Sequence, residues 1–145
     1  MLERARGDAP EPRPTDPIAR GYALSVVVPT FNEEANMATL IARVGAVLDG
    51  QAWQIIVVDD DSPDGTAEAV KAIAATDTRV QCIRRVRRRG LAGAVIEGAL
   101  ASAAPFVAVI DGDLQHDETL LPRMLEVLQA GEADLVVAKI GRAHV

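Results

Sequence analysis

The chain has 145 residues, 49% of them hydrophobic and 3% aromatic, and a formal net charge of −6. These values fit one globular domain with an aliphatic core, and they argue against a disordered chain and against nucleic acid as a partner. No apolar run reaches the roughly 18 to 20 residues of a membrane span, and the single cysteine, Cys82, excludes an internal disulfide and suits a reducing compartment.

The first segment, residues 1–21, contains four prolines and charges of both signs. A segment of this composition has too little apolar surface to bury, so a disordered leader is expected. The ordered domain is expected to cover residues 22–138.

Strand and helix patterns alternate through this domain. Apolar, β-branched runs indicate strands covered on both faces, and apolar residues at helical spacing indicate the helices between them. Because strands separated by single helices need crossover connections, the sequence predicts an α/β fold with a mainly parallel sheet and flanking helices. The predicted strands are Leu24–Thr30, Trp53–Asp60, Arg79–Arg85, Pro105–Asp111 and Asp134–Ala138, and the predicted helices are Glu33–Leu48, Asp64–Ala74, Leu91–Ala103 and Thr119–Ala130.

The motif PTFNEE begins at Pro29 and leads from the first predicted strand into the first helix. Pro29 gives the loop a rigid start, and Asn32 is a candidate helix cap. Glu33 and Glu34 suit a helix N-terminus electrostatically. A functional interpretation has Glu33 hydrogen-bonding a nucleotide.

The acidic run DDDSPDGT begins at Asp59, where the second predicted strand ends. Three adjacent carboxylates repel one another at neutral pH, so a cation, a sugar hydroxyl or a base N–H is expected to face them. Asp59, Asp60 and Asp61 are therefore interpreted as ligand-facing. Asp64 is expected to cap the next helix.

Five arginines lie within six residues in RRVRRRGLAGA, which begins at Arg84. In an acidic chain, this cluster would suit a diphosphate or an anionic lipid surface, and a charged edge strand is an equally weighted alternative. Gly90 and Gly93 flank the start of a helix, where backbone N–H groups can bind phosphate. Neither GxGxxG nor a P-loop motif occurs.

The segment DGDLQHD begins at Asp111, directly after the fourth predicted strand, and ligands of parallel sheets bind at such strand ends. On an extended segment Asp111 and Asp113 would point the same way and share one Mg²⁺ or Mn²⁺ ion, with Gln115 as a further oxygen donor. Gly112 would permit the close approach of another group. A solvated turn is an equally weighted alternative, and His116 is assigned no role.

Together and in this order, PTFNEE, VVDDDSPDGT, RRGLAGA and DGDLQHDETLLP resemble family 2 glycosyltransferases, and most closely the dolichyl- and polyprenyl-phosphate mannosyltransferases. The resemblance covers about residues 24–138. It implies a GT-A fold and a metal-dependent, inverting transfer of a hexose, with mannose favoured. The donor would be GDP-mannose or a UDP-sugar, the acceptor a polyprenyl or dolichyl phosphate, and the enzyme would be cytoplasmic with peripheral membrane contact.

The resemblance also implies roles for individual residues. Where family members commonly read DADLQHPP, this chain reads DGDLQHDE, which leaves the metal ligands unchanged and alters the loop around them. A lipid phosphate acceptor is already an anion near pH 7 and needs no general base. The implied residues are Pro29, Glu33, Asp60 and Arg89 for the nucleotide, Asp111 and Asp113 for catalysis, and Asp111, Asp113 and Gln115 for Mg²⁺ or Mn²⁺.

The last residues, 139–145, depart from this resemblance. Family members continue beyond the fifth strand, whereas the ending IGRAHV matches a translated sequencing-adapter read, so a non-native tail is expected. An inactive fragment without its acceptor-binding half is expected as well.

Three alternatives remain open from the sequence. A glycosyltransferase that uses UDP-glucose or another acceptor would carry the same motifs. A phospho-accepting receiver domain would use Asp59 and Asp60 as its acidic pair and Asp111 as its acceptor, but the lysine that it requires is present only as Lys139. A nucleotidyltransferase would need a glycine-rich activating loop, which is absent.

Overall fold

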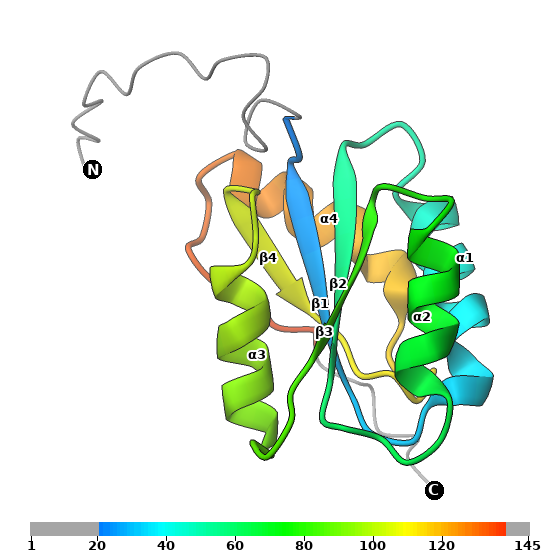
Figure 1. Ribbon diagram of the computed structural model, residues 1–145. Coiled ribbons are helices and arrows are strands. Elements are labelled where there is room, and N and C mark those ends of the chain that lie inside the picture. The colour runs from blue at the N-terminus through cyan, green and yellow to red at the C-terminus, as the bar shows by residue number, and fades with distance from the viewer. Residues whose placement is uncertain (1–20, 139–145) are drawn as a thin grey trace, which may run out of the picture.

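The computed structural model describes residues 21–138. The predicted non-native tail and nearly all of the predicted leader lie outside these residues. Four of the five predicted strands form, and a helix follows each of them (Figure 1). The elements are β1 (Leu24–Thr30), α1 (Glu34–Val47), β2 (Trp53–Asp59), α2 (Thr66–Ala74), β3 (Val80–Arg84), α3 (Leu91–Leu100), β4 (Phe106–Val109), η2 (Glu118–Leu120) and α4 (Leu121–Gln129).

The four strands form one parallel sheet in the order β3-β2-β1-β4. In the central register, Val26 of β1 lies opposite Ile55 of β2 on one side and Ala108 of β4 on the other. The α/β prediction is therefore confirmed. Because every strand runs in the same direction, all four carboxyl ends meet at one edge of the sheet.

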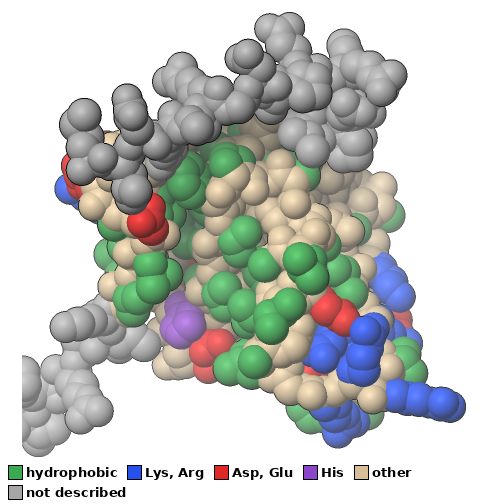
Figure 2. Space-filling view, turned by 90° about the vertical axis from the view of Figure 1, so that its left-hand side faces the viewer, with side chains coloured by type: hydrophobic (Ala, Val, Ile, Leu, Met, Phe, Trp, Pro, Cys, Tyr) green, Lys and Arg blue, Asp and Glu red, His purple; other side chains and the backbone are tan. Residues whose placement is uncertain are grey.

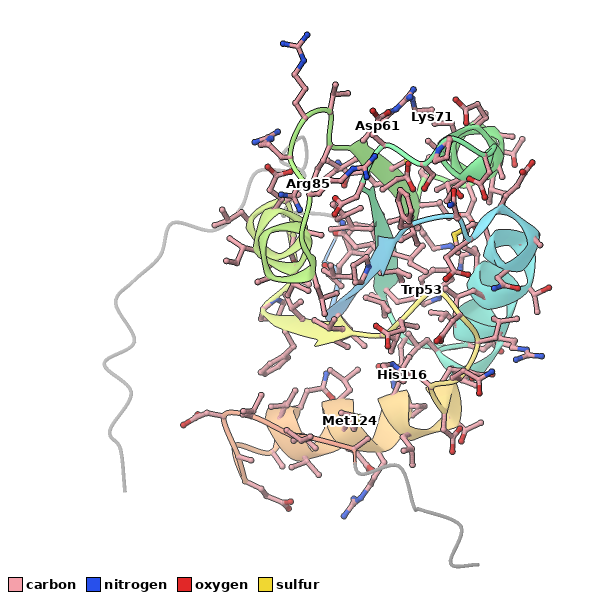
Figure 3. The ribbon with its side chains drawn as sticks, turned by 90° about the horizontal axis from the view of Figure 1, so that it is seen from below. Trp53, Asp61, Lys71, Arg85, His116 and Met124 are labelled. Atoms are coloured by element: carbon pink, nitrogen blue, oxygen red, sulfur yellow. The ribbon has the colours of Figure 1, made fainter. Side chains whose placement is uncertain are left out.

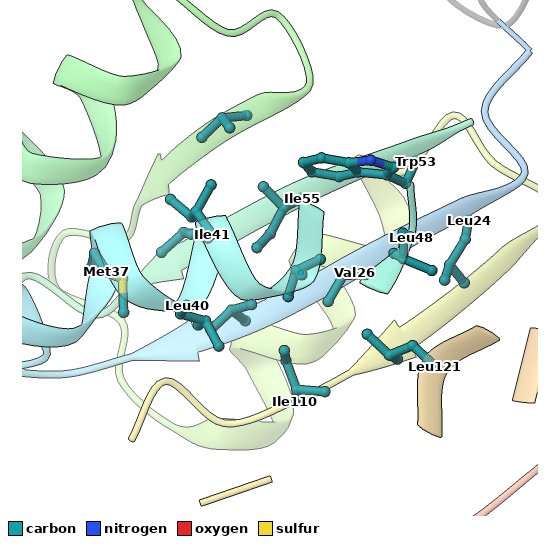
Figure 4. Close-up of a cluster of buried hydrophobic side chains, with 14 of the residues drawn as sticks. Leu24, Val26, Met37, Leu40, Ile41, Leu48, Trp53, Ile55, Ile110 and Leu121 are labelled. Atoms are coloured by element: carbon teal, nitrogen blue, oxygen red, sulfur yellow. The ribbon is translucent and has the colours of Figure 1, made fainter. Parts of the chain in front are cut away.

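The main core lies between the sheet and the helices α1, α2 and α4 (Figure 4). Val26 and Ile55 face it from the sheet, and Met37 and Leu121 reach it from the helices. Each aliphatic side chain buried in this way stabilises the fold by about 1.5 to 3 kcal/mol relative to an exposed one. The continuous apolar runs of the strands thus account for this layer.

Among the described residues, 21–138, α3 is the only helix that covers the opposite face of the sheet. Its core is smaller and includes Val27, Val58 and Ala94. The helix packs closely because Gly98 has no side chain, and a Cβ there would come within 2.4 Å of Val27 Cγ1. Large apolar side chains remain exposed on the outer side of this layer, where apolar atoms cover much of the surface (Figure 2). They include Leu91, Ile96 and Leu100 of α3.

The prediction of a fifth strand is wrong, because Asp134–Ala138 forms no strand. A strand needs a hydrogen-bonded neighbour, and this segment pairs with none within residues 21–138, although β4 is an edge strand with one side unpaired. The segment instead borders a groove of about 560 Å³, together with β4 and α4. Leu135 and Val137 are 77% and 71% exposed, so this segment leaves apolar side chains uncovered.

All four helices differ from their predicted bounds, the first two by no more than two residues at either end. The third ends at Leu100, three residues before the predicted end at Ala103. The fourth begins as the short 3-10 helix η2, and Pro122 lies in the first turn of α4, where a missing N–H has no cost. No helix within residues 21–138 is both long and apolar enough to cross a membrane.

Candidate functional site

The loops that follow the four strands carry all four sequence motifs. They share the carboxyl edge of the sheet, which is the view of Figure 3. There Arg85 lies on the side of α3, and His116 lies on the side of α4. Pro29 belongs to the end of β1, opposite Val58 of β2, and is half-buried. The β1–α1 loop follows Pro29 and connects the α3 side of the site to its α4 side.

Asp59 is a buried structural residue, which corrects the prediction that it faces a ligand. Its side chain is fully buried. Its carboxylate accepts hydrogen bonds from the hydroxyls of Thr30 at 3.0 Å and Ser62 at 2.6 Å, and from the backbone N–H of Ser62 at 3.0 Å. Through these bonds, the Asp59 carboxylate joins the ends of β1 and β2.

The β1–α1 loop is held by side chains of the next loop. The backbone N–H of Asn32 donates to Ser62 Oγ at 2.9 Å, and that of Glu33 donates to Thr66 Oγ1 at 3.0 Å. Asn32 has a left-handed φ of 56°, and Glu33, not Asn32, occupies the N-cap position of α1. The Glu33 carboxylate is half-buried and accepts a 2.7 Å hydrogen bond from the Asn36 amide. Glu33 is therefore held in one orientation at the sheet edge.

Asp64 is structural, as predicted, but Gly65 and not Asp64 occupies the N-cap position of α2. Its carboxylate accepts hydrogen bonds from the backbone N–H groups of Thr66 at 2.9 Å and Glu34 at 3.3 Å, so it serves the starts of both α1 and α2. The hydroxyl of Thr66 also donates to it and holds the pKa of Asp64 below its ordinary value. In return, Gly65 N–H donates to Glu34 Oε2 at 3.0 Å.

Asp60 is held by the arginine loop. The backbone N–H of Gly90 donates to its Oδ2 at 3.0 Å, and Arg85 Nη1 lies 3.3 Å from its Oδ1. Arg85 is only 5% exposed, donates to the Gly90 carbonyl at 3.0 Å, and lies 3.5 Å from Glu97. Two of these charge contacts lack hydrogen-bond geometry: the contact of Arg85 Nη1 with Asp60 Oδ1, and the contact of Arg85 Nε with Glu97. Asp60 therefore joins β2 to the loop before α3.

Asp61 is neutralised by Arg84, which donates to its Oδ1 at 2.8 Å. This bond raises the pKa of the Arg84 guanidinium above its ordinary value. The repulsion between the three adjacent carboxylates is thus offset by protein donors, which corrects the prediction that a ligand must supply them. Arg84 ends β3, the edge strand of the sheet, as the edge-strand interpretation expected for part of the cluster.

The remaining arginines lie in the exposed loop before α3. Arg88 contacts Glu97 at 2.6 Å. The guanidinium of Arg89 stacks over the ring of Phe31, 5.1 Å from its centroid, and this ring is 46% exposed. Arg87 has a left-handed φ of 64°. The structure therefore divides the cluster into buried, paired and exposed members, and Arg89 is exposed beside the β1–α1 loop.

The segment after β4 is a turn, so the prediction of an extended segment is wrong. The chain turns at Gly112 and Asp113, and Leu114 has a left-handed φ of 64°. Asp113 Oδ1 accepts a hydrogen bond from the backbone N–H of Gln115 at 3.1 Å. Because Asp111 and Asp113 lie in a turn, the rule that residues i and i+2 of a strand point the same way does not apply to them.

Because Gly112 has no side chain, this turn packs against the β1–α1 loop. The close approach predicted at Gly112 is therefore present. A Cβ there would lie 3.0 Å from Thr30 Cγ2 and 3.3 Å from both Glu33 Cγ and Met37 Cε. Two of the predicted site segments thus pack directly on each other. The Glu33 segment and the Asp111 turn therefore lie side by side at the carboxyl edge of the sheet.

His116 is a residue that the sequence interpretation missed. Its Nδ1 accepts a hydrogen bond from the backbone N–H of Asp111 at 3.0 Å, and its Nε2 lies 3.2 Å from Asp111 Oδ2. A histidine five residues after an aspartate follows no helix or strand period, so periodicity could not find this contact. Only its place in a strand-end turn could have indicated it.

The donors on this turn fit a hard divalent cation. Two carboxylates and one amide offer the oxygen ligands that Mg²⁺ and Mn²⁺ favour, and the side chain of Asp111 is 48% exposed. Residues 21–138 contain no group of three or more His, Cys, Asp or Glu residues suited to a metal. This donor set suits a cation that also binds substrate phosphates, as Mg²⁺ commonly does, better than a closed protein cage.

Comparison with known proteins identifies relatives of this chain. Residues 25–144 match the family described as glycosyl transferase family 2. The chain is 38% identical over 108 residues to a dolichol-phosphate mannosyltransferase of Pyrococcus furiosus, and the aligned region covers 74% of this chain and 30% of that protein. It is 34% identical over 125 residues to a dodecaprenyl-phosphate galacturonate synthase of Rhizobium johnstonii, covering 84% of this chain and 37% of that protein.

A solved structure shows the same architecture. It is a mannosyltransferase from Pyrobaculum calidifontis in complex with GDP-Man and Mn²⁺, with a TM-score of 0.61 and 26% identity, covering 75% of this chain and 33% of that one. The chain thus spans about a third of the length of these relatives.

Proposed function

Since the chain belongs to glycosyl transferase family 2, we propose that it forms the donor-binding part of an enzyme that transfers a hexose to a polyprenyl or dolichyl phosphate. The donor in this proposal is a nucleotide-diphosphate sugar, and a divalent cation takes part. The parallel sheet with flanking helices is of the GT-A type. This premise makes the carboxyl edge of the sheet the place of the reaction.

One observation carries the proposal: the Asp111 turn packs on the Glu33 loop through Gly112, at the carboxyl edge of the sheet. The contact places two oxygen-rich segments together beside the exposed Arg89. A diphosphate needs such an arrangement, because its charge must be offset by a cation and by basic groups.

Each candidate residue has a role in this proposal. Asp111 and Asp113 hold Mg²⁺ or Mn²⁺, with Gln115 as a third donor. Arg89 contacts the diphosphate. Pro29, Glu33 and Asp60 surround the nucleoside, and Asp60 and Glu33 supply carboxylates to its hydrogen-bond donors.

The proposed reaction is a single displacement. An oxygen of the acceptor phosphate forms a bond to the anomeric carbon while the bond to the nucleoside diphosphate breaks, so the configuration inverts. Negative charge builds on the departing diphosphate, and a divalent cation, when bound, offsets it. The acceptor phosphate is an anion near pH 7, so no side chain must remove a proton.

The names of the relatives support the acceptor class more strongly than the sugar. They include a dolichol-phosphate mannosyltransferase of Saccharomyces cerevisiae, a dodecaprenyl-phosphate galacturonate synthase and an undecaprenyl-phosphate 4-deoxy-4-formamido-L-arabinose transferase. The carrier is a polyprenyl phosphate in each name, whereas the sugar differs. Mannose from GDP-mannose is our first choice, because it recurs among these relatives and in the complex with GDP-Man.

A UDP-glucose donor with a different acceptor is the second candidate. A glucosyl-3-phosphoglycerate synthase of Mycobacterium tuberculosis, solved with Mn²⁺, UDP-Glc and phosphoglyceric acid, has a TM-score of 0.60 and 26% identity. The receiver-domain alternative loses support, because Asp59, one of its acidic pair, is fully buried and bonded to Thr30 and Ser62.

Thermal shift assays with GDP-mannose, UDP-glucose and acetyl phosphate, each with and without Mn²⁺, test the proposal. We expect stabilisation by one nucleotide sugar that depends on Mn²⁺. Stabilisation by acetyl phosphate alone would contradict it. We further propose that the enzyme works in the cytoplasm, at the cytoplasmic face of the membrane where a polyprenyl phosphate is presented.

A further inference from the structure

His116 contacts Asp111 with both nitrogens of its imidazole ring. The backbone N–H of Asp111 donates to Nδ1 at 3.0 Å, and Nε2 lies 3.2 Å from Oδ2. Because Nδ1 accepts a hydrogen bond, a neutral ring carries its proton on Nε2, which faces the carboxylate. A single side chain therefore contacts both the main chain and the carboxylate of Asp111.

The turn that carries this contact is anchored in the fold. Leu114, between the two residues, packs against the main core, and Gly112 lies against Thr30 and Glu33. His116 is one third exposed and lines the groove beside α4 (Figure 3). The ring is thus held between the turn and the helix, so its contacts constrain Asp111 more than those of a freely moving loop side chain would.

The two oxygens of Asp111 differ in their surroundings. Oδ2 is the oxygen that lies 3.2 Å from His116 Nε2, and neither carboxylate oxygen accepts a hydrogen bond within residues 21–138. The side chain as a whole is 48% exposed, so without a contact it would sample several rotamers. A group that holds a metal ligand from outside fixes its orientation, and the loss of such a group typically weakens metal binding about 10- to 100-fold.

We propose that His116 is a positioning residue for Asp111: Nδ1 holds the Asp111 backbone by a hydrogen bond, Nε2 lies in charge contact with Oδ2, and together these contacts present Oδ1 to the divalent cation. The inference rests on the proposed function, because the cation belongs to it. His116 itself does not contact the cation or the substrate. Its effect is exerted through the orientation of one carboxylate.

Three substitutions separate the two contacts of the ring. In His116→Asn, the side-chain oxygen takes the place of Nδ1 and accepts from the Asp111 N–H, but nothing replaces Nε2. In His116→Gln, the amide nitrogen takes the place of Nε2 and faces the carboxylate. His116→Ala removes both contacts. Melting temperatures close to that of the wild type in the Asn and Gln variants would establish that the fold is kept.

The first measurement is the dissociation constant of Mn²⁺ in the presence of GDP, from the electron paramagnetic resonance signal of free Mn²⁺. We expect His116→Ala and His116→Asn to raise it about ten-fold or more, and His116→Gln to remain closer to the wild type. Equal Mn²⁺ affinity in His116→Ala and the wild type would overturn the inference and leave the proposed function intact. Wild-type affinity in His116→Asn would also overturn it, since His116 would then only close the turn.

The second measurement needs no metal. The ¹⁵N resonances of the imidazole ring in the metal-free protein report which nitrogen carries the proton. We expect the neutral ring to carry its proton on Nε2, because Nδ1 accepts the Asp111 N–H. A ring protonated on Nδ1 alone would overturn the inference whatever the protein's function. Absence of Mn²⁺-dependent GDP binding in the wild type, by contrast, would remove the proposed function and this inference with it.

Discussion

The guanidinium of Arg85 occupies the space that a side chain at Gly93 would need. A Cβ at residue 93 would come within 2.6 Å of Arg85 Nη2. The glycine in the first turn of α3 therefore serves to bury an arginine, and that arginine in turn contacts Asp60 and the carbonyl of Gly90. The second glycine of RRGLAGA is explained by this contact without a bound phosphate.

We predict that Gly93→Ala destabilises the protein by about 1 to 3 kcal/mol, the usual effect of overpacking, although alanine favours a helix. The cause would be displacement of Arg85. Urea unfolding measures the change. Ala92→Ser, at the exposed neighbouring position, is the matched control and should shift the free energy of unfolding by no more than about 0.5 kcal/mol. Equal stability of Gly93→Ala and the wild type would contradict the packing argument.

The two neighbouring arginines should differ in their contribution to stability. Arg85→Met leaves Asp60 and Glu97 without their buried partner and should cost about 3 kcal/mol or more. Arg84→Met breaks an ion pair whose arginine is 41% exposed, so solvent screening should make its effect clearly smaller than that of Arg85→Met. Chemical unfolding of both variants compares them, and similar losses would refute the distinction.

Asp60→Asn should weaken nucleotide binding by more than about 1 kcal/mol, the scale of a charge-assisted hydrogen bond. Calorimetry with GDP and UDP measures it, and circular dichroism checks the fold. Asp61→Asn, whose carboxylate is paired with Arg84 instead, is the control and should bind nucleotide like the wild type. If Asp60→Asn binds as tightly as the wild type, Asp60 has only its structural role.

Nucleotide binding should lose its metal dependence when the turn carboxylates are removed. Asp111→Ala and Asp113→Ala should each abolish the increase in GDP or UDP affinity that Mn²⁺ produces, because they supply the proposed oxygen ligands. Asp117→Ala is a control on the same loop, since its carboxylate accepts from Thr119 N–H at 3.0 Å. Unchanged Mn²⁺ dependence in both turn variants would end the metal assignment.

Cys82 should react slowly with alkylating reagents in the folded protein. Burial raises the pKa of its thiol above the ordinary value of 9.0, and only the thiolate is reactive. The folded state thus holds the proton more tightly than the unfolded chain, so the stability from this group is present below pH 9.0 and is lost as the pH rises through the raised pKa. Iodoacetamide labelling at several pH values, with and without urea, checks this. Equal rates in both states would contradict it.

The sequence by itself determined the sheet and the position of the motifs. Leu24–Thr30 and Trp53–Asp59 form strands within one residue of their predicted bounds, because continuous apolar runs are buried in any parallel sheet. The alternation of strands and helices then required parallel pairing, which places PTFNEE, DDDSPDGT and DGDLQHD at one edge. These are consequences of local pattern and chain connectivity.

Only the tertiary structure decided what each polar side chain contacts. Asp59, Asp60 and Asp61 look alike in sequence, yet one is bonded to Thr30, one to Gly90 and one to Arg84. These partners lie between 23 and 30 residues away, on loops that meet only after the strands pair. A local period carries no information about such contacts.

The same reason explains the turn after β4 and the absent fifth strand. The turn at Gly112 depends on its packing against Thr30 and Glu33, and His116 reaches Asp111 only because the chain turns there. Asp134–Ala138 has the composition of a strand, but strand formation is a property of two hydrogen-bonded segments, and this segment pairs with no strand within residues 21–138.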